Sequence, residues 1–170
     1  RLAAGKKVED FEKAFANYLG VKDVVTVSSG SDADMIALNV LMNPRLKNPL
    51  KKGDEILTCA LNFATPISSI LQNNLKPVLV DTKLGNYTMD TELLEGAISE
   101  RTKAILAVHI FGNTCDMNDV MRLAEEHDLY VIEDSCDAHG SLYDGKKVGS
   151  IGDMGTFSFY PAHQMTLMEG

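Results

Sequence analysis

A histidine ends the motif Ser-Phe-Tyr-Pro-Ala-His, which runs from Ser158 to His163. The imidazole of histidine titrates near neutral pH and can therefore take up and release a proton during a reaction. A lone histidine is more often structural than catalytic, so both interpretations of His163 stay open on this motif alone. The remaining histidines are interpreted as structural, and they are His109, His127 and His139.

Three carboxylates follow a hydrophobic run in the sequence Val-Ile-Glu-Asp-Ser-Cys-Asp, which spans residues 131–137. A carboxylate at the end of a strand, such as Asp134, can keep a pyridinium nitrogen protonated and so make a pyridoxal ring an electron sink. The same residue could cap a helix or bind a metal ion. Asp134 and Asp137 together could hold magnesium, although nothing else in the sequence completes a cage of oxygen ligands.

A run of small polar residues, Ser28-Ser29-Gly30-Ser31, lies between a β-branched run and a helical pattern. Hydroxyl groups and the amides of a first helical turn can donate hydrogen bonds to an anion, and small residues let the backbone come close to it. A serine N-cap on an ordinary turn is the alternative. The run matches neither the P-loop pattern nor the dinucleotide-binding glycine pattern, so it supports neither of those folds.

The elements that position these residues alternate between β-branched runs and helical patterns. Strands are predicted at residues 24–27, 55–58, 77–80, 104–108 and 129–132, and an alternating strand leads from residue 155 toward His163. Helices are predicted at residues 8–19, 33–41, 66–72, 91–98 and 118–127, with Gly20 as a C-terminal stop and Thr91 and Asn118 as N-caps. A surface loop is predicted at residues 43–53.

This alternation predicts the fold class. Each strand–helix–strand step indicates a right-handed parallel crossover, so we expect an α/β protein with three layers, α/β/α, around a mainly parallel sheet. In such sheets ligands bind at the carboxyl ends of the strands. The three polar groups described above would all lie at that edge.

The composition limits the class of function. The 170 residues are 45% hydrophobic, enough for one folded unit, and 16 basic against 24 acidic side chains give a net charge of −8, which disfavours nucleic acid and anionic membrane surfaces as partners. No apolar run reaches the ~18 residues of a spanning helix. Cys59, Cys115 and Cys136 lack the spacing of a disulfide framework or a zinc site, so we expect a cytoplasmic protein without a metal site.

Taken together and in this order, these segments resemble the DegT-type sugar aminotransferase and dehydratase family, which shares the type I fold of enzymes dependent on pyridoxal 5′-phosphate (PLP). The resemblance covers essentially all 170 residues. It implies that residues 1–170 are the N-terminal part of the cofactor-binding large domain, with the rest of that domain and the small domain outside this chain. It also implies a homodimer for the full-length protein.

The resemblance implies roles for five residues. Gly30 and Ser31 match the turn that binds the cofactor phosphate, and Ser158 matches the serine that touches the same phosphate. Phe63, in the segment Asn-Phe-Ala-Thr, matches the aromatic residue that stacks on the pyridine ring. Asp134 matches the carboxylate that holds the ring nitrogen.

Two further positions depart from the aminotransferase pattern of the family. His163 stands where ordinary aminotransferases have the lysine that binds the cofactor covalently. Asp137, which we count among the cofactor-binding residues, stands where they usually have glutamine. Both departures resemble the hexulose 3-dehydratases, which use pyridoxamine 5′-phosphate (PMP) bound without a covalent link.

The resemblance therefore implies a PMP/PLP-dependent lyase that removes water at C3 of a nucleotide-linked 4-keto-6-deoxyhexose in deoxysugar and lipopolysaccharide O-antigen biosynthesis, with His163 as catalytic base and acid. The cofactor would be regenerated by glutamate or by a separate reductase. The reductase-dependent type carries a 2Fe–2S cluster on cysteines of its C-terminal part, which the three cysteines here do not match. The alternatives are a PLP-dependent nucleotide-sugar aminotransferase and a catalytically inactive homologue or fragment.

Overall fold

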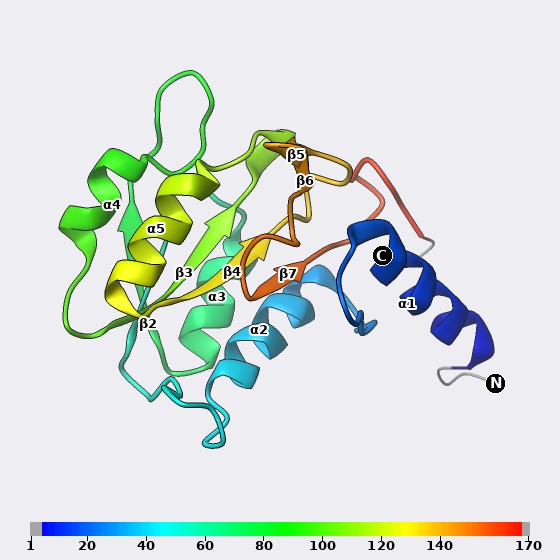
Figure 1. Ribbon diagram of the computed structural model, residues 1–170, viewed down its shortest axis with the longest axis horizontal. Helices are drawn as coiled ribbons and strands as arrows, with labels where there is room; N and C mark the ends of the chain where they lie inside the picture. The colour runs from blue at the N-terminus through cyan, green and yellow to red at the C-terminus, as the bar shows by residue number, and fades with distance from the viewer. Residues whose placement is uncertain (1–4, 168–170) are drawn as a thin grey trace.

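A parallel sheet of five strands forms the centre of the computed structural model, with the strand order β2-β1-β3-β4-β7 (Figure 1). The structure describes residues 5–167, so residues 1–4 and 168–170 of the predicted large-domain segment lie outside the described residues. The strands of this sheet are β1 Glu55–Cys59, β2 Lys76–Val80, β3 Thr102–Val108, β4 Tyr130–Asp134 and β7 Met154–Thr156. Two short strands, β5 Leu142–Tyr143 and β6 Lys146–Lys147, form a separate antiparallel ribbon.

In the part of the chain that the structure describes, five α-helices and one short 3₁₀ helix surround the sheet. They are α1 Lys6–Leu19, α2 Gly30–Leu41, α3 Ala64–Gln72, α4 Thr91–Ala97, α5 Met117–His127 and the 3₁₀ helix η1 Ile110–Gly112. No helix within residues 5–167 is long and apolar enough to cross a membrane.

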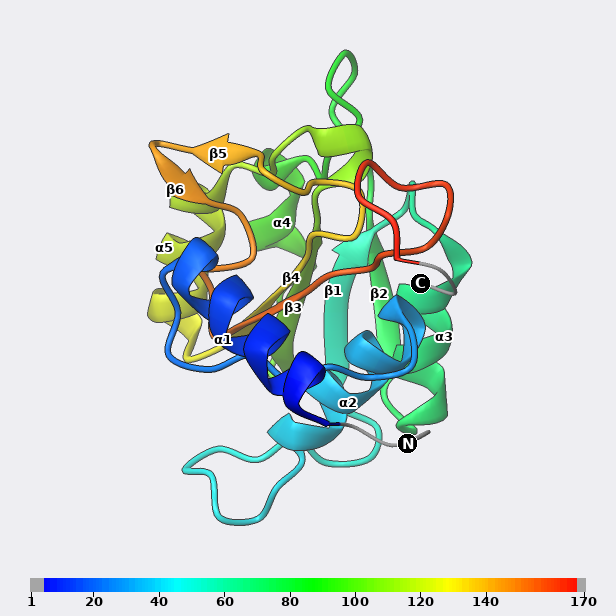
Figure 2. The ribbon, with the colours of Figure 1, turned by 90° about the vertical axis from the view of Figure 1, so that its right-hand side faces the viewer.

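Successive residues of the central strands face opposite sides of the sheet, as the two-residue period of a strand requires. On β1, Ile56 packs in a buried cluster with residues of α2 and α3, whereas Leu57 packs in another with residues of α4 and α5. Figures 1 and 2 show these two pairs of helices on the two faces. The predicted three-layer α/β/α fold with a parallel sheet is therefore confirmed.

Helix α1 lies apart from the two helical layers and crosses in front of the sheet in Figure 2. An aromatic cluster attaches it to the chain that follows β7. The ring of Phe15 lies edge-on to that of Phe157, with 5.1 Å between centroids, and Phe11 contacts Phe159 in the same manner at 5.4 Å. The predicted stop is confirmed, because Gly20 adopts the left-handed conformation with φ 78° directly after the helix.

The predicted strand at residues 24–27 is wrong. This segment joins no sheet within the described residues, and 78% of Val25 is exposed. The reason is a competing partner: both the backbone N–H and the hydroxyl of Thr26 donate to Glu12 Oε1 of α1, each at 2.8 Å. A run of valines favours a strand only where a neighbouring strand is present to accept its ladder.

Two predicted N-caps are also wrong. Asp90 caps α4 by accepting from Glu92 N at 3.1 Å, and Asp116 caps α5 by accepting from Asp119 N at 3.3 Å. Thr91 lies inside α4, and Asn118 lies inside α5. An aspartate stands one or two residues before each predicted cap, and its carboxylate reaches the free amides of the first turn.

Candidate active site

The predicted site residues gather at the carboxyl edge of the sheet, as expected for a parallel α/β fold. Asp134 is the last residue of β4 and is paired in register with Thr156, the last residue of β7. Ser158 follows two residues later, and Gly30 begins α2. Three segments that are far apart in the sequence therefore meet at one place.

Gly30 and Ser158 are in direct contact. A Cβ atom placed on Gly30 would lie 2.7 Å from Ser158 Cβ and 3.0 Å from Cys136 Sγ, so no larger residue fits at position 30 without a shift. The first turn of α2 offers free backbone amides at this point, beside the Ser158 hydroxyl. Ser31 lies in the same turn, partly buried. This arrangement fits a phosphate group, since small residues, amides and a hydroxyl converge on one spot.

The N-terminus of α2 is held in place by its own side chains. Ser29 is the N-cap, and its hydroxyl accepts from Asp32 N at 3.1 Å. On the other side, His139 Nε2 donates to the carbonyl oxygen of Ser158 at 2.7 Å. This hydrogen bond to the main chain agrees with the interpretation of His139 as a structural histidine, and it ties the residue to the backbone of a predicted site residue.

Asp134 is a buried carboxylate, with only 5% of the residue exposed. Its Oδ1 accepts from Cys136 N at 3.0 Å. Burial raises the pKa of Asp134 above its ordinary value, while the hydrogen bonds from Cys136 and the nearby His109 act in the opposite direction. A carboxylate that is buried at a strand end and only partly satisfied can bind a cationic ring nitrogen strongly.

Asp34 was not foreseen as a site residue. It lies on α2 with 1% exposure, its Oδ1 accepts from the hydroxyl of Thr156 at 2.6 Å, and its carboxyl group lies close to that of Asp134, the register partner of Thr156. A signal was present in the sequence, because Asp34 precedes the buried Leu38 and Leu41 by four and seven residues. That spacing places an acid on the apolar face of a helix.

His163 pairs with Asp137, the other residue that departs from the aminotransferase pattern. His163 Nδ1 lies 2.7 Å from Asp137 Oδ1, and the histidine side chain is 19% exposed. A tight turn places the histidine, since His163 N donates to Tyr160 O at 2.9 Å. Because an ionised carboxylate only accepts, Nδ1 carries the hydrogen, and the other ring nitrogen, Nε2, can exchange a proton with a bound molecule.

Phe63 lies on the same edge of the sheet, four residues after the end of β1. It occupies the N-cap position of α3, and 73% of the residue is exposed. An aromatic ring with so much free surface beside a polar site can stack on a flat ligand.

The metal and cysteine predictions concern the same edge. Within residues 5–167 no group of three or more histidine, cysteine or acidic side chains could hold a metal ion. Asp134 and Asp137, the pair considered for magnesium, form hydrogen bonds or ion pairs with Cys136 and His163 respectively.

The three cysteines are free thiols, and burial raises the pKa of each, so they are neutral at physiological pH.

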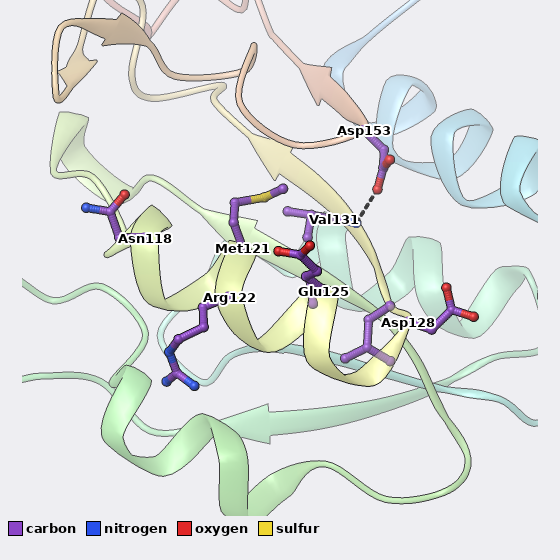
Figure 3. A pocket seen from close by; sticks show the side chains of 9 residues that line it. Asn118, Met121, Arg122, Glu125, Asp128, Val131 and Asp153 are labelled. Atoms are coloured by element: carbon purple, nitrogen blue, oxygen red, sulfur yellow. Dashed lines mark hydrogen bonds between the residues drawn. The ribbon is translucent and has the colours of Figure 1, made fainter.

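A surface depression beside α5 contains none of the predicted site residues (Figure 3). It lies near the start of β4, at the opposite end of this strand from Asp134. Asp153 reaches across at this point, and its Oδ2 accepts from Val131 N at 2.8 Å. The depression is therefore separate from the candidate active site.

Comparison with known proteins gives one consistent family. Residues 1–170 match the DegT/DnrJ/EryC1/StrS aminotransferase family. The lipopolysaccharide biosynthesis protein RfbH of Salmonella typhimurium is 44% identical over 170 residues, which are 99% of this chain and 39% of that protein. The dTDP-4-dehydro-2,6-dideoxy-D-glucose 3-dehydratase of Saccharopolyspora spinosa is 43% identical over 171 residues, which are 100% of this chain and 37% of that protein.

The similar proteins also include a perosamine synthase and a solved structure of a dehydratase. A GDP-perosamine synthase of Caulobacter vibrioides is 39% identical over 168 residues, which are 99% of this chain and 43% of that protein. The E. coli GDP-4-keto-6-deoxy-D-mannose-3-dehydratase with bound hydrated PLP superimposes with a TM-score of 0.93 at 34% identity, over 98% of this chain and 43% of that one. The chain thus spans about two fifths of the length of these relatives.

Proposed function

The chain belongs to the DegT/DnrJ/EryC1/StrS aminotransferase family, and on this premise we propose that it forms the N-terminal part of the large domain of a PMP-dependent 3-dehydratase. Its substrate would be a nucleotide-linked 4-keto-6-deoxyhexose, from which it removes water at C3. The pairing of His163 with Asp137 carries this proposal, because it puts an imidazole with a free nitrogen where the aminotransferases of the family have a lysine.

The residues present fit the cofactor. We assign its phosphate to the first turn of α2 at Gly30 and Ser31, together with the Ser158 hydroxyl, because the missing side chain at position 30 lets Ser158 come close to the free amides of this turn. We assign its ring nitrogen to Asp134 and one ring face to Phe63. When bound, PMP supplies an amine for the keto group of the sugar and a ring that accepts electrons.

The proton transfers fall to His163. Its Nδ1 is fixed by Asp137, so Nε2 is the atom that accepts a proton and returns it to the departing C3 hydroxyl. Asp137 holds the imidazole in one tautomer and one orientation and stabilises its charged form. On this proposal Asp137 acts on His163, in addition to the cofactor-binding role that we expected from the sequence.

The remaining expectations belong to the same proposal. Glutamate or a separate reductase would regenerate the aminated cofactor, and the whole protein would act as a homodimer. A 2Fe–2S cluster, if the reductase-dependent type applies, would be bound outside this chain. The three free cysteines fit the reducing environment of the cytoplasm.

The test uses the protein that contains this chain, with PMP and a panel of nucleotide-linked 4-keto-6-deoxyhexoses, and follows the loss of one water by mass spectrometry. His163→Asn should lower the dehydration rate ~10²–10⁴-fold, the usual worth of general acid–base catalysis. His127→Asn, a change at an exposed position in the last turn of α5, should leave the rate unchanged. Full activity of His163→Asn would overturn the proposal.

The same mixtures distinguish the aminotransferase alternative, which is supported by the similarity to a sugar-nucleotide transaminase of Aneurinibacillus thermoaerophilus, 38% identical over 155 residues. An aminotransferase would convert the keto sugar into an amino sugar with glutamate as donor. It would also yield a cofactor linked to lysine after treatment with borohydride. Either result without loss of water would replace the dehydratase proposal.

A further inference from the structure

Asp34 is an acid in an apolar place. It lies on the inner face of α2, where Leu38 is fully buried, and only 1% of the aspartate is exposed. Moving a carboxylate out of water into such a place costs several kcal/mol unless hydrogen-bond donors satisfy both of its oxygens. The donors around Asp34 therefore decide its charge.

Only one oxygen of Asp34 has a donor within residues 5–167. Oδ1 accepts from the Thr156 hydroxyl at 2.6 Å, whereas Oδ2 is buried and has no donor. The carboxyl of Asp134 lies close by, because Asp134 is the register partner of Thr156, whose hydroxyl donates to Asp34. Two ionised carboxylates can only accept, so a hydrogen bond between these two acids requires a proton on one of them.

The surroundings place that proton on Asp34. Burial raises the pKa of Asp34 well above its ordinary value of 3.8, and the negative charge of Asp134 raises it further. Asp134 has the better support for a charge, because Cys136 donates to it and His109 lies nearby. Two other ionisable groups lie near this pair of acids. The neutral Cys136 thiol is close to both carboxyls, and the negative charge of Asp137 acts on Asp134.

We propose that Asp34 is a positioning residue that stays protonated and donates its Oδ2–H to Asp134, so that the pair presents a single negative charge to the ring nitrogen of the cofactor. This inference rests on the role proposed above for Asp134. It explains why an acid stands on the apolar face of α2: a protonated carboxyl is the donor that fixes the orientation of Asp134 from behind. An asparagine would present an N–H at the same place, whereas leucine would remove the donor and keep the volume.

The first experiment detects the proton without any catalysis. Infrared spectra of the cofactor-free protein, carrying carbon-13 in its aspartate carboxyls, should show the band of a protonated carboxylic acid at neutral pH. The band should disappear in Asp34→Asn and persist in Asp10→Asn, which changes an exposed aspartate of α1. A spectrum without this band in the unaltered protein, or a band that persists in Asp34→Asn, would overturn the inference.

The second experiment measures PMP binding by absorbance titration. Asp34→Asn should bind PMP as tightly as the unaltered protein, and Asp34→Leu should bind it ~10–100-fold more weakly, the worth of one hydrogen bond to a charged group. Equal weakening in both variants, or none in Asp34→Leu, would contradict the role. If the unaltered protein bound no PMP, the proposed function would fail, while the infrared result would still decide the position of the proton.

Discussion

Two acidic residues that are neighbours on β4 have opposite environments. Glu133 is fully buried on one side of the strand and receives four hydrogen bonds, two on each carboxylate oxygen. Its donors are Gly149 N at 2.8 Å, Ile151 N at 2.6 Å, Gly152 N at 2.7 Å and His109 Nε2 at 3.1 Å. Asp134, on the other side, has one backbone donor and a second carboxyl beside it.

The number of hydrogen bonds that each buried acid receives distinguishes a structural carboxylate from one that can still bind a ligand. The hydrogen bonds of His109, Gly152 and Gly149 hold the pKa of Glu133 below its ordinary value, although burial acts to raise it. Such a carboxylate has no remaining capacity for a ligand and stabilises the loop that donates to it. Asp134 keeps acceptor capacity at the carboxyl edge of the sheet, and burial raises its pKa, which fits the binding role that we propose for it.

The largest effect on stability is expected for Glu133→Gln. The amide side chain turns an N–H toward backbone donors, so the variant should lose about 3–5 kcal/mol of unfolding free energy, measured by chemical denaturation. Glu95→Gln, the same change at an exposed position of α4, serves as the control. A loss below ~1 kcal/mol would remove the distinction between the two acids.

Asp134→Asn should have the reverse profile. The cofactor-free protein should unfold at the same denaturant concentration or a higher one, because a costly buried charge is gone. PMP binding should weaken ~10–100-fold, since the ring nitrogen loses its ionised partner. Chemical denaturation measures the stability and absorbance titration measures PMP binding, both on one preparation of the variant. A variant that unfolds at lower denaturant concentration but binds PMP normally would contradict the comparison.

Asp34, the partner proposed for Asp134, and Glu133 should also have opposite effects on the pH dependence of stability. Asp34 keeps its proton in the folded state, whereas the unfolded chain releases it above about pH 4, so stability should fall as pH rises by up to ~1.4 kcal/mol per pH unit. The lowered pKa of Glu133 gives stability that is present above its ordinary pKa of 4.5 and lost in acid. Asp34→Asn should therefore flatten the decline between weakly acidic and neutral pH, and an unchanged slope in thermal melts would argue against a protonated Asp34.

The smallest effect is expected for Thr156→Val. This change removes the hydroxyl that donates to Asp34 Oδ1 at 2.6 Å and keeps the shape of the side chain. Because Asp34 is neutral on our inference, the loss should be about 0.5–1.5 kcal/mol, the range of an uncharged hydrogen bond. A loss near 3 kcal/mol, typical of a bond to a charged group, would indicate that Asp34 is ionised.

Much of the fold could be predicted from local patterns. Strands β1 to β4 and the five predicted helices lie close to their predicted positions. They could be predicted because hydrophobic periodicity is a property of a short stretch of chain. The strand at residues 24–27 failed because a strand needs a partner, and Thr26 is bound by Glu12 of α1 instead. The predicted N-caps of α4 and α5 were wrong because two possible capping residues lie close together at each helix start. The backbone conformation, which the sequence pattern does not give, determines which of the two caps the helix.

The sequence by itself determined the chemical groups and their order: a small turn at Gly30, an acid at the strand end, and a histidine five residues after Ser158. Only the tertiary structure decided which of these groups touch. It brought Asp34 to Asp134, although a hundred residues separate them, and it placed Asp137 against His163. The reason is physical. The sequence specifies the type of each side chain, whereas its charge and its hydrogen bonds depend on burial and on neighbouring groups that are brought together only by folding.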